Sequence, residues 1–179
     1  KYHQSKPADL WPRRCLFRNR FRRQRRFGRC HERPLMLSLD VNVLIYAFRQ
    51  DSVKHEECRD WLNKQIRDRN GLILIDIVLV GFLRICTHSK IFREPSSILE
   101  ATNFLTVMIS NPNVSLTSST PETWHTFSQI LDKTNVQGNK ISDAWLAAIS
   151  IERNLTWIST DSDFNLFPNL KLQNPFKPK

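Results

Sequence analysis

The sequence lacks the motifs that would assign it to several common classes of enzyme. It has no C-x-x-C pair, no phosphate-binding P-loop, no G-x-G-x-x-G motif and no Ser/His nucleophile pairing. Its longest apolar run, residues 72–83, is interrupted by Asp76 and is too short to cross a bilayer. No apolar core of a secretory signal precedes the first predicted strand. These absences predict a soluble cytoplasmic protein, without membrane contact, whose cysteines are free thiols.

Charge is distributed unevenly along the chain. The 179 residues carry a net charge of +10. Residues 1–35 contain twelve Lys or Arg and two Asp or Glu, whereas residues 36–179 contain fifteen of each sign. Blocks of like charge without apolar periodicity are typically disordered. We therefore expect residues 1–35 to form a disordered basic extension and residues 36–179 to form one neutral, folded domain.

Two interpretations of the basic extension stay open. In the first, it is an arm that binds nucleic-acid phosphates. In the second, Met36 is the natural start and residues 1–35 are upstream or added sequence. We favour the second interpretation, because Met36 stands directly before the first predicted strand.

Short apolar runs alternate with helical patterns over residues 36–172. The patterns predict strands near 36–41, 72–75, 114–116, 155–158 and 170–172, and helices over 43–48, 51–67, 77–87, 95–109, 121–133 and 142–154. The helix over 77–87 is apolar nearly all round and is expected to be buried. Strands that alternate with helices predict an α/β protein of three α/β/α layers, with a central, mainly parallel sheet of four to five strands.

Four aspartates occupy equivalent places in this pattern. Asp40 ends the first strand, Asp161 and Asp163 follow the fourth, and Asp143 lies at the start of the preceding helix. The carboxyl ends of parallel strands share one edge of a sheet, so these carboxylates are expected to converge there. A single aspartate is more often a helix cap or a turn residue. Four of them at one edge favour a functional site.

Converging carboxylates repel one another unless a cation neutralises them. Ligands that are all oxygen select hard divalent ions, so the expected cofactor is Mg²⁺ or Mn²⁺. Such a site suits hydrolysis of a phosphodiester, because one ion activates water and a second can stabilise the leaving oxygen.

Three segments resemble the signature blocks of PIN-domain ribonucleases, and the closest group is the VapC toxins of bacterial toxin–antitoxin pairs. The three segments are LDVNVLIY at 39–46, ISDAWLAA at 141–148 and ISTDSDF at 158–164. The segments VGFLRI at 80–85 and THSKIF at 87–92 also resemble that group. The resemblance covers residues 36 to about 175 in the family's order and spacing. It implies a PIN-like α/β/α fold, dependence on magnesium or manganese, RNA cleavage, a homodimer and a cognate antitoxin.

The resemblance also implies roles for individual positions. Asp40, Asp143 and Asp161 match the family's core acids and are expected to be catalytic and to bind the metal. Asp163 matches a further acid near the metal. Ser159 stands where the family usually has Thr, a small hydroxyl that can hold a carboxylate or a water.

Other positions are supporting or divergent. Asn42 matches a small polar residue beside the first Asp, and from its position it is also expected to cap the helix that follows. Gly81 departs from the family, which commonly has Glu there. Arg84, His88 and Lys90 are candidates for contacts with RNA or with the antitoxin, and the alternative is that they are solvated charges beyond a buried helix.

Three hypotheses of function remain at this point. The leading one is a metal-dependent endoribonuclease toxin. The second is a catalytically weakened PIN domain that mainly binds RNA or an antitoxin, and Gly81 favours it. The third is a nuclease of RNA processing that is not a toxin.

Overall fold

The computed structural model describes residues 35–68 and 70–177, which lie in the unit Arg33–Lys179. The predicted basic extension, apart from Leu35, lies outside these residues. In chain order the elements are β1 (Met36–Leu39), α1 (Val41–Phe48), α2 (His55–Arg67), β2 (Gly71–Ile75), α3 (Asp76–Cys86), α4 (Ile98–Ile109), β3 (Val114–Thr117), α5 (Pro121–Thr134), α6 (Lys140–Glu152), β4 (Thr156–Ile158), a 3-10 helix (Ser162–Leu166) and β5 (Lys171–Gln173).

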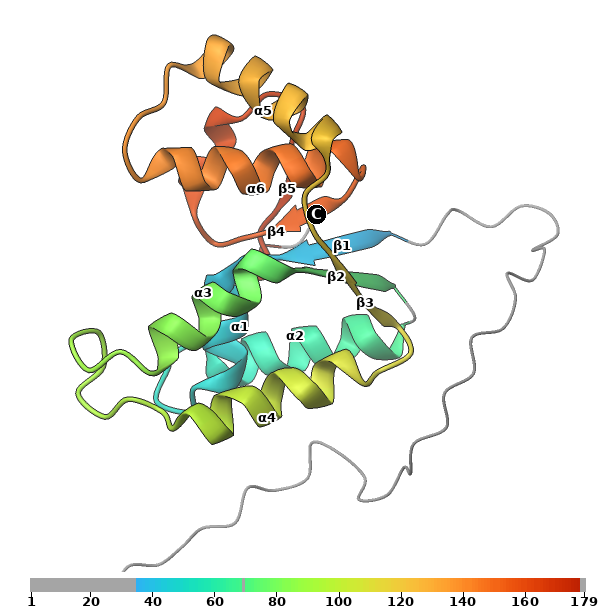
Figure 1. Ribbon diagram of the computed structural model, residues 1–179. Coiled ribbons are helices and arrows are strands. Elements are labelled where there is room, and N and C mark those ends of the chain that lie inside the picture. Colours follow the sequence, from blue (N-terminus) through green and yellow to red (C-terminus); the bar gives the residue numbers. More distant parts are fainter. Residues whose placement is uncertain (1–34, 69, 178–179) are drawn as a thin grey trace, which may run out of the picture. The chain divides into compact units, whose positions relative to one another are not determined.

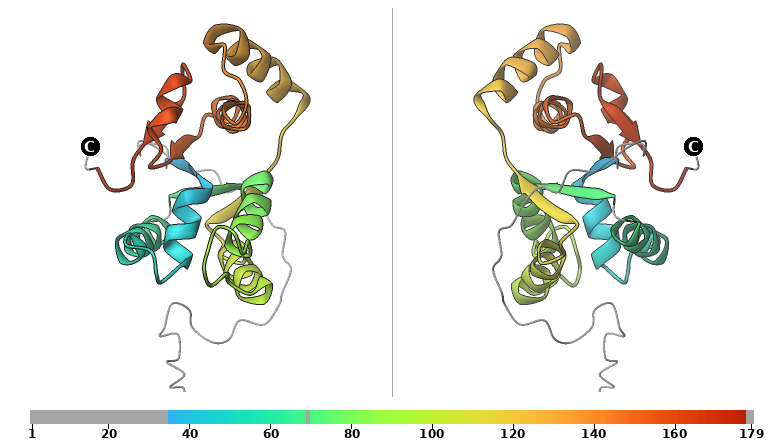
Figure 2. Two further views of the ribbon diagram at one scale, coloured as in Figure 1. Left: turned by 90° about the vertical axis from the view of Figure 1, so that its left-hand side faces the viewer. Right: turned by 90° about the vertical axis from the view of Figure 1, so that its right-hand side faces the viewer.

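The strands form one parallel sheet in the order β3-β2-β1-β4-β5. Helices α1 to α4 cover one face of the sheet, and α5 and α6 cover the other (Figure 1; Figure 2). Right-handed crossovers explain this division, because the chain moves outward from β1 to β3 and then returns past β1 to reach β4. The predicted three-layer α/β/α fold with a parallel sheet is confirmed.

The two faces of the sheet are packed differently. On the first face, the rings of Phe48, Phe82 and Phe104 join α1, α3 and α4, with centroids 5.2–5.5 Å apart. On the second face, α6 presents Ala144, Ala147 and Ala148, all fully buried. Small side chains let the backbone of α6 approach the sheet closely, so the start of this helix is held near the ends of the central strands.

Some predicted boundaries are wrong at the helix starts. Asn42 does not cap α1, because β1 ends at Leu39 and Asp40 takes the N-cap position, which leaves Asn42 inside the first turn. Helix α2 begins at His55 rather than near Asp51, whose carboxylate pairs with Arg49 instead. Helix α6 begins earlier than predicted, at Lys140.

Helix α3 is not buried on all sides, contrary to the prediction. Its Ile77 and Val80 side chains are 49% and 65% exposed, while Val78 and Phe82 are buried. An apolar helix whose outer face is exposed offers that face to another molecule. Among the described helices, none combines the length and the apolar character needed to cross a membrane.

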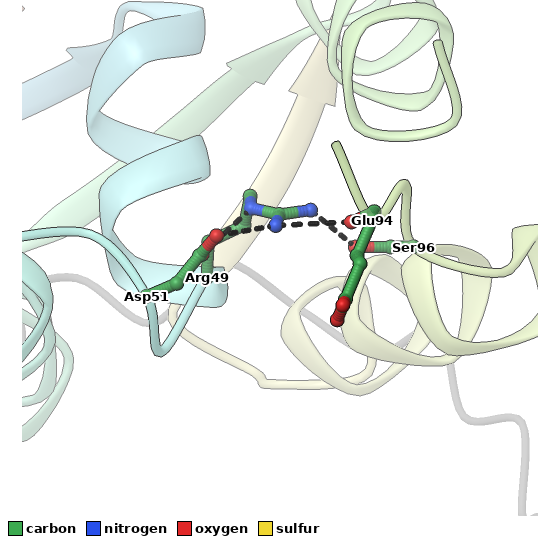
Figure 3. A network of polar contacts seen from close by, with 4 residues as sticks. All are labelled: Arg49, Asp51, Glu94 and Ser96. Atoms are coloured by element: carbon green, nitrogen blue, oxygen red, sulfur yellow. Dashed lines mark hydrogen bonds and ion pairs between the residues drawn. The ribbon is translucent and has the colours of Figure 1, made fainter. Parts of the chain in front are cut away.

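The loop between α3 and α4 is held by a buried arginine. Arg49, at the end of α1, donates two hydrogen bonds of 2.8 and 2.6 Å to the carboxylate of Asp51. It also donates to Ser96 Oγ and to the carbonyl of Glu94, each at 3.1 Å (Figure 3). The ring of Phe92 lies under the guanidinium, 3.8 Å from its carbon to the ring centroid. The Arg49 side chain therefore holds the part of this loop from Phe92 to Ser96 against the end of α1.

Candidate active site

The candidate site lies where the strand order reverses. Strands β1 and β4 are neighbours, yet the chain leaves them toward opposite edges of the sheet. Asp40 follows β1, and its backbone N–H donates to the carbonyl of Ile158 at 2.9 Å. Such reversal points open a crevice at the carboxyl ends of parallel strands, and this is where open α/β sheets bind their ligands.

Asp40 is held by a side chain from the other central strand. The hydroxyl of Ser159 donates a hydrogen bond of 2.6 Å to Asp40 Oδ2, and Asn42 Nδ2 lies 3.4 Å from the same oxygen. Asp40 is only 4% exposed, and although it occupies the N-cap position of α1, its side chain makes no capping hydrogen bond. The carboxylate is therefore oriented toward the site rather than used to cap the helix.

A relay of hydrogen bonds continues beyond Ser159. The backbone N–H of Asp161 donates to Ser159 Oγ at 3.0 Å, and the N–H of Asp163 donates to Asp161 Oδ1 at 2.8 Å. Asp161 is thus also the cap of the 3-10 helix. The sequence left open whether Asp161 caps a helix or belongs to the site. In the structure its Oδ1 atom serves as a cap.

Burial, with smaller contributions from the charges of Asp143 and Asp161, raises the pKa of Asp40 to about 6, and the hydrogen bonds from Ser159 and from the backbone of Val41 oppose this rise. The pKa of Asp143 is also raised, first by burial and then by the charges of Asp161 and Asp163. Asp40 directly follows β1, Asp143 lies in α6, and Asp161 and Asp163 follow β4, so the charges that act on Asp40 and Asp143 come from separate elements. Asp40 and Asp161 are joined through Ser159, and the charge of Asp143 acts on Asp40, whereas the convergence of all four acids around one ion stays a prediction.

The chemistry of the donor set fits a hard divalent cation. All four side chains offer carboxylate oxygens, and their mutual repulsion would be relieved by positive charge. Among residues 35–68 and 70–177, however, no three His, Cys, Asp or Glu side chains lie close enough together to hold an ion. Binding an ion at Asp40, Asp143, Asp161 and Asp163 therefore requires side-chain movement.

Lys140 is a residue of this site that sequence reasoning missed. Its Nζ lies 3.3 Å from Asp163 Oδ2. It is the first residue of α6, three positions before Asp143, and its charge lowers the pKa of that carboxyl. Helical spacing indicates only that Lys140 shares a helix face with Asp143, because residues three apart lie on one face; the ion pair with Asp163 depends on the tertiary structure.

Gly81 lies beside the site, in the second turn of α3 as predicted. A Cβ placed on it would meet only Val41 Cγ2, at 3.8 Å, which is an ordinary contact. Val41 follows Asp40 directly in the chain, so a side chain at position 81 would start next to the residue that carries the buried carboxylate.

The three predicted contact residues for RNA or antitoxin lie near one end of α3. Arg84 is exposed in the last turn of the helix, and His88 and Lys90 follow it in the loop. The backbone N–H of Lys90 donates to His88 Nδ1 at 3.0 Å. In the part of the chain that the structure describes, no hydrogen bond or ion pair joins them to the four aspartates. They form a separate exposed polar group.

The two described cysteines take no part in this chemistry. Cys58 and Cys86 are free and buried, and burial raises the pKa of their thiols to about 12 and about 11. A thiol in this state is a poor nucleophile at neutral pH.

Comparison with known proteins decides the family. The model of the PIN domain matches residues 37–170. The chain belongs to the PIN-domain family. This match runs from the second residue of β1 past the end of the 3-10 helix and contains the four aspartates, so the site described above is part of the PIN domain.

Curated relatives of this PIN domain are named VapC ribonucleases. One, "VapC ribonuclease Mb2897" of Mycobacterium bovis, is 36% identical over 140 residues, which cover 78% of this chain and 95% of the relative. Another, "Ribonuclease VapC25" of Mycobacterium tuberculosis, is 30% identical over 140 residues, covering 78% of this chain and 99% of the relative. The PIN domain thus matches these relatives over nearly their whole length.

Solved structures share the fold at lower identity. A VapBC2 complex of Rickettsia felis bound to a promoter DNA fragment matches with a TM-score of 0.59 and 18% identity, covering 78% of this chain and 98% of the matched chain. VapC20 of Mycobacterium tuberculosis, described as a toxin that cleaves the sarcin–ricin loop, matches with a TM-score of 0.55 and 12% identity, covering 75% and 98%. These matches support the α/β/α architecture.

Proposed function

We propose that residues 36–179 form an endoribonuclease that depends on Mg²⁺ or Mn²⁺, and that the protein is the toxin of a toxin–antitoxin pair. The observation that carries this proposal is the linked arrangement of Asp40, Ser159 and Asp161 at the reversal point of the sheet, with Asp143 close enough to raise the pKa of Asp40. The names of the curated relatives support the reaction class.

The four aspartates would hold the divalent ion, with Asp40, Asp143 and Asp161 as the catalytic ligands and Asp163 as a further ligand. Such an ion, when bound, would make a water easier to deprotonate for attack on a phosphodiester of RNA and would place positive charge opposite the developing negative charge. Ser159 fixes the rotamer of Asp40 through its 2.6 Å hydrogen bond. Because the pKa of Asp40 is about 6, this carboxyl is mostly ionised and ready to bind a cation at pH 7 and above.

A second candidate function is a weakened PIN domain that acts mainly by binding RNA or an antitoxin. Gly81 favours this alternative, because it supplies no carboxylate at a position where a Cβ would meet Val41, the residue after Asp40. The two functions differ in a measurable way: the nuclease turns over RNA, whereas the binding protein holds it intact.

Partners follow from the exposed surfaces and from the relatives. A cognate antitoxin is supported by the VapBC complexes among the solved structures, and Arg84, His88 and Lys90 are the residues we assign to contacting it or RNA phosphates. The exposed apolar face of α3, with Ile77 and Val80, supports a homodimer. Light scattering of the wild type and of Val80→Lys would test the homodimer.

The test of the function is RNA cleavage by purified aspartate variants. Asp143→Asn and Asp161→Asn are each expected to abolish cleavage that requires Mg²⁺, while circular dichroism shows an unchanged fold. Asp132→Asn is the matched control, since Asp132 is an exposed residue of α5. A triple variant at Asp40, Asp143 and Asp161 that still cuts RNA at the wild-type rate would end the assignment. RNA held intact by the wild type would favour the weakened PIN domain.

A further inference from the structure

A single lysine approaches the acidic cluster. Among the ion pairs of the described residues, only that of Lys140 with Asp163 involves one of the four site aspartates, with 3.3 Å between Nζ and Oδ2. The two partners come from separate elements: Lys140 opens α6, and Asp163 lies in the 3-10 helix after β4. The ion pair therefore bridges the two segments that carry Asp143 and Asp161.

The charge of Lys140 acts on more than its direct partner. Asp143 lies three residues further along α6, on the same side of the helix. Burial and the charges of Asp161 and Asp163 raise the pKa of Asp143, and Lys140 is the group that opposes them. The ammonium thus compensates negative charge on both α6 and the 3-10 helix.

The four carboxylates of the site outnumber its single nearby ammonium, so the charge of Lys140 affects how strongly the site attracts a cation. Four carboxylates and one ammonium give the site a net charge of −3 when all are ionised. Position 81 adds no carboxylate, because it is glycine. A divalent ion that approaches Asp163 must share it with an ammonium already paired there, and like charges repel at short range.

The ion pair is also easy to displace. The side chains of Lys140 and Asp163 are 43% and 49% exposed. Exposed ion pairs contribute little to stability, so a stronger cation can take Asp163 without unfolding its surroundings. Lys140 therefore affects how tightly a divalent ion binds, rather than whether the protein folds.

We propose that Lys140 is a built-in counter-cation of the site, a positioning residue that holds Asp163 through their ion pair and competes with a divalent ion for that carboxylate. The proposal rests on the proposed function only in that the site binds a divalent ion. It assigns to Lys140 a role opposite to that of a substrate-binding lysine, whose loss would weaken RNA binding and leave metal affinity unchanged.

The experiment is calorimetric titration of Mn²⁺ into the full chain and its variants. Lys140→Met keeps the aliphatic stem and removes the charge, and it is expected to tighten Mn²⁺ binding by roughly three- to tenfold, the effect of one nearby unit charge on a divalent ion at moderate salt. Lys140→Arg, which keeps the charge, is expected to bind within about twofold of the wild type. Lys64→Met on α2, across the sheet from α6, is the matched control.

A double-mutant cycle isolates the ion pair. In an Asp163→Asn background, Lys140→Met is expected to lose most of its effect on Mn²⁺ affinity, because the carboxylate under competition is gone. Unchanged or weaker Mn²⁺ binding by Lys140→Met would overturn the proposal, and so would an equal gain from Lys64→Met. The absence of Mn²⁺ binding in both wild type and Lys140→Met would overturn it as well.

Parallel cleavage assays separate this proposal from the proposed function. If wild-type protein cuts RNA with Mn²⁺ but Lys140→Met binds the ion no more tightly, the nuclease stands and the role of Lys140 fails. If Lys140→Met binds Mn²⁺ more tightly and neither protein cuts RNA, the role of Lys140 stands and the nuclease fails.

Discussion

The hydroxyl of Ser159 donates a 2.6 Å hydrogen bond to Oδ2 of Asp40, across 119 positions of sequence. The same oxygen of Ser159 accepts the backbone N–H of Asp161 at 3.0 Å. One hydroxyl therefore couples Asp40, the residue that follows β1, to the segment that follows β4. A serine suffices for this geometry at a position where the PIN family usually has threonine, because only the hydroxyl oxygen takes part.

Asp40→Asn is expected to stabilise the protein at pH 7.5 in the absence of divalent ions. Burial raises the pKa of Asp40 from an ordinary 3.8 to about 6, so the folded state holds this proton more tightly than the unfolded chain does. Stability therefore falls as the pH rises through this window, and the full cost of ionisation is present above pH 6. Removing the charge is expected to raise the free energy of unfolding by about 1–3 kcal/mol, measured by urea unfolding.

The pH dependence distinguishes this effect from simple repacking. Near pH 4 the carboxyl of Asp40 is already protonated in the folded wild-type protein. The difference in free energy of unfolding between wild type and Asp40→Asn is therefore expected to be much smaller than at pH 7.5. Asp132→Asn, at an exposed site on α5, is expected to track the wild type at both pH values. An equal gap at pH 4 and pH 7.5 would contradict the assigned pKa.

The parallel sheet and the nearness of Asp40 to Asp161 could be predicted from sequence, because both follow from the chain's order of elements. Apolar runs separated by helical patterns predict parallel strands, and parallel strands bring Asp40 and Asp161 to one edge whatever their separation. Helix starts could not be predicted as well. A strand that ends one or two residues earlier transfers the N-cap position from Asn42 to Asp40, and both residue types are good caps.

The exposed face of α3 and the role of Lys140 could not be predicted for different reasons. An apolar residue such as Val80 has the same signal in a core as on a partner-binding surface, so periodicity alone predicts burial. The ion pair of Lys140 with Asp163 depends on how α6 is placed against the 3-10 helix, and only the tertiary structure gives that placement.

Arg49→Met is expected to lower the free energy of unfolding by about 2–3 kcal/mol, because it removes hydrogen bonds to Ser96 and Glu94 and the contact with Phe92. Asp51 is 63% exposed and stays hydrated when the arginine is lost, so no buried charge is left uncompensated. Urea unfolding would measure the loss, provided that the dependence of the free energy of unfolding on urea concentration has the wild-type slope.

Arg59→Met is the matched control for this change. Arg59 lies 3.5 Å from Asp60 in a more exposed ion pair, and its loss is expected to cost less than about 0.5 kcal/mol. Arg49→Lys is expected to resemble Arg49→Met, because an ammonium cannot reproduce the planar fork that reaches three partners. Equal losses at positions 49 and 59 would show that the network does not stabilise the loop.

Arg84→Ala and Lys90→Ala together are expected to weaken binding of the antitoxin or RNA by about tenfold, because each removes an exposed positive charge beside α3. Among the described residues, neither Arg84 nor Lys90 forms a hydrogen bond or ion pair with the four site aspartates. The affinity for Mn²⁺ is therefore expected to stay at the wild-type value. Fluorescence anisotropy with labelled RNA and with the antitoxin, at two salt concentrations, would measure the change. Unaltered binding to both would identify these residues as solvated surface charges.

Gly81→Glu is expected to tighten Mn²⁺ binding. A Cβ at this position meets only Val41 Cγ2, at 3.8 Å, so the substitution introduces no clash at its first atom. The residue before Val41 is Asp40, and a glutamate would extend its carboxylate from α3 toward the acidic cluster. Affinity in all-oxygen sites rises with the number of anionic ligands, so we expect wild-type protein to bind one ion firmly and a second weakly, and Gly81→Glu to strengthen the weaker one.

Gly81→Ala separates the carboxylate from the helix propensity of the new residue. Both substitutions replace a glycine inside α3, and each is expected to add about 0.5–1 kcal/mol of helix stability through the backbone alone. The added repulsion among carboxylates is expected to offset part of this gain in Gly81→Glu until Mn²⁺ is present. Calorimetric titration of Mn²⁺ into wild type, Gly81→Ala and Gly81→Glu would then give a tighter second site only in the glutamate variant. Two equally tight sites in the wild type would mean that Gly81 costs the site nothing and that another acid, such as Asp163 or Asp76, already completes it.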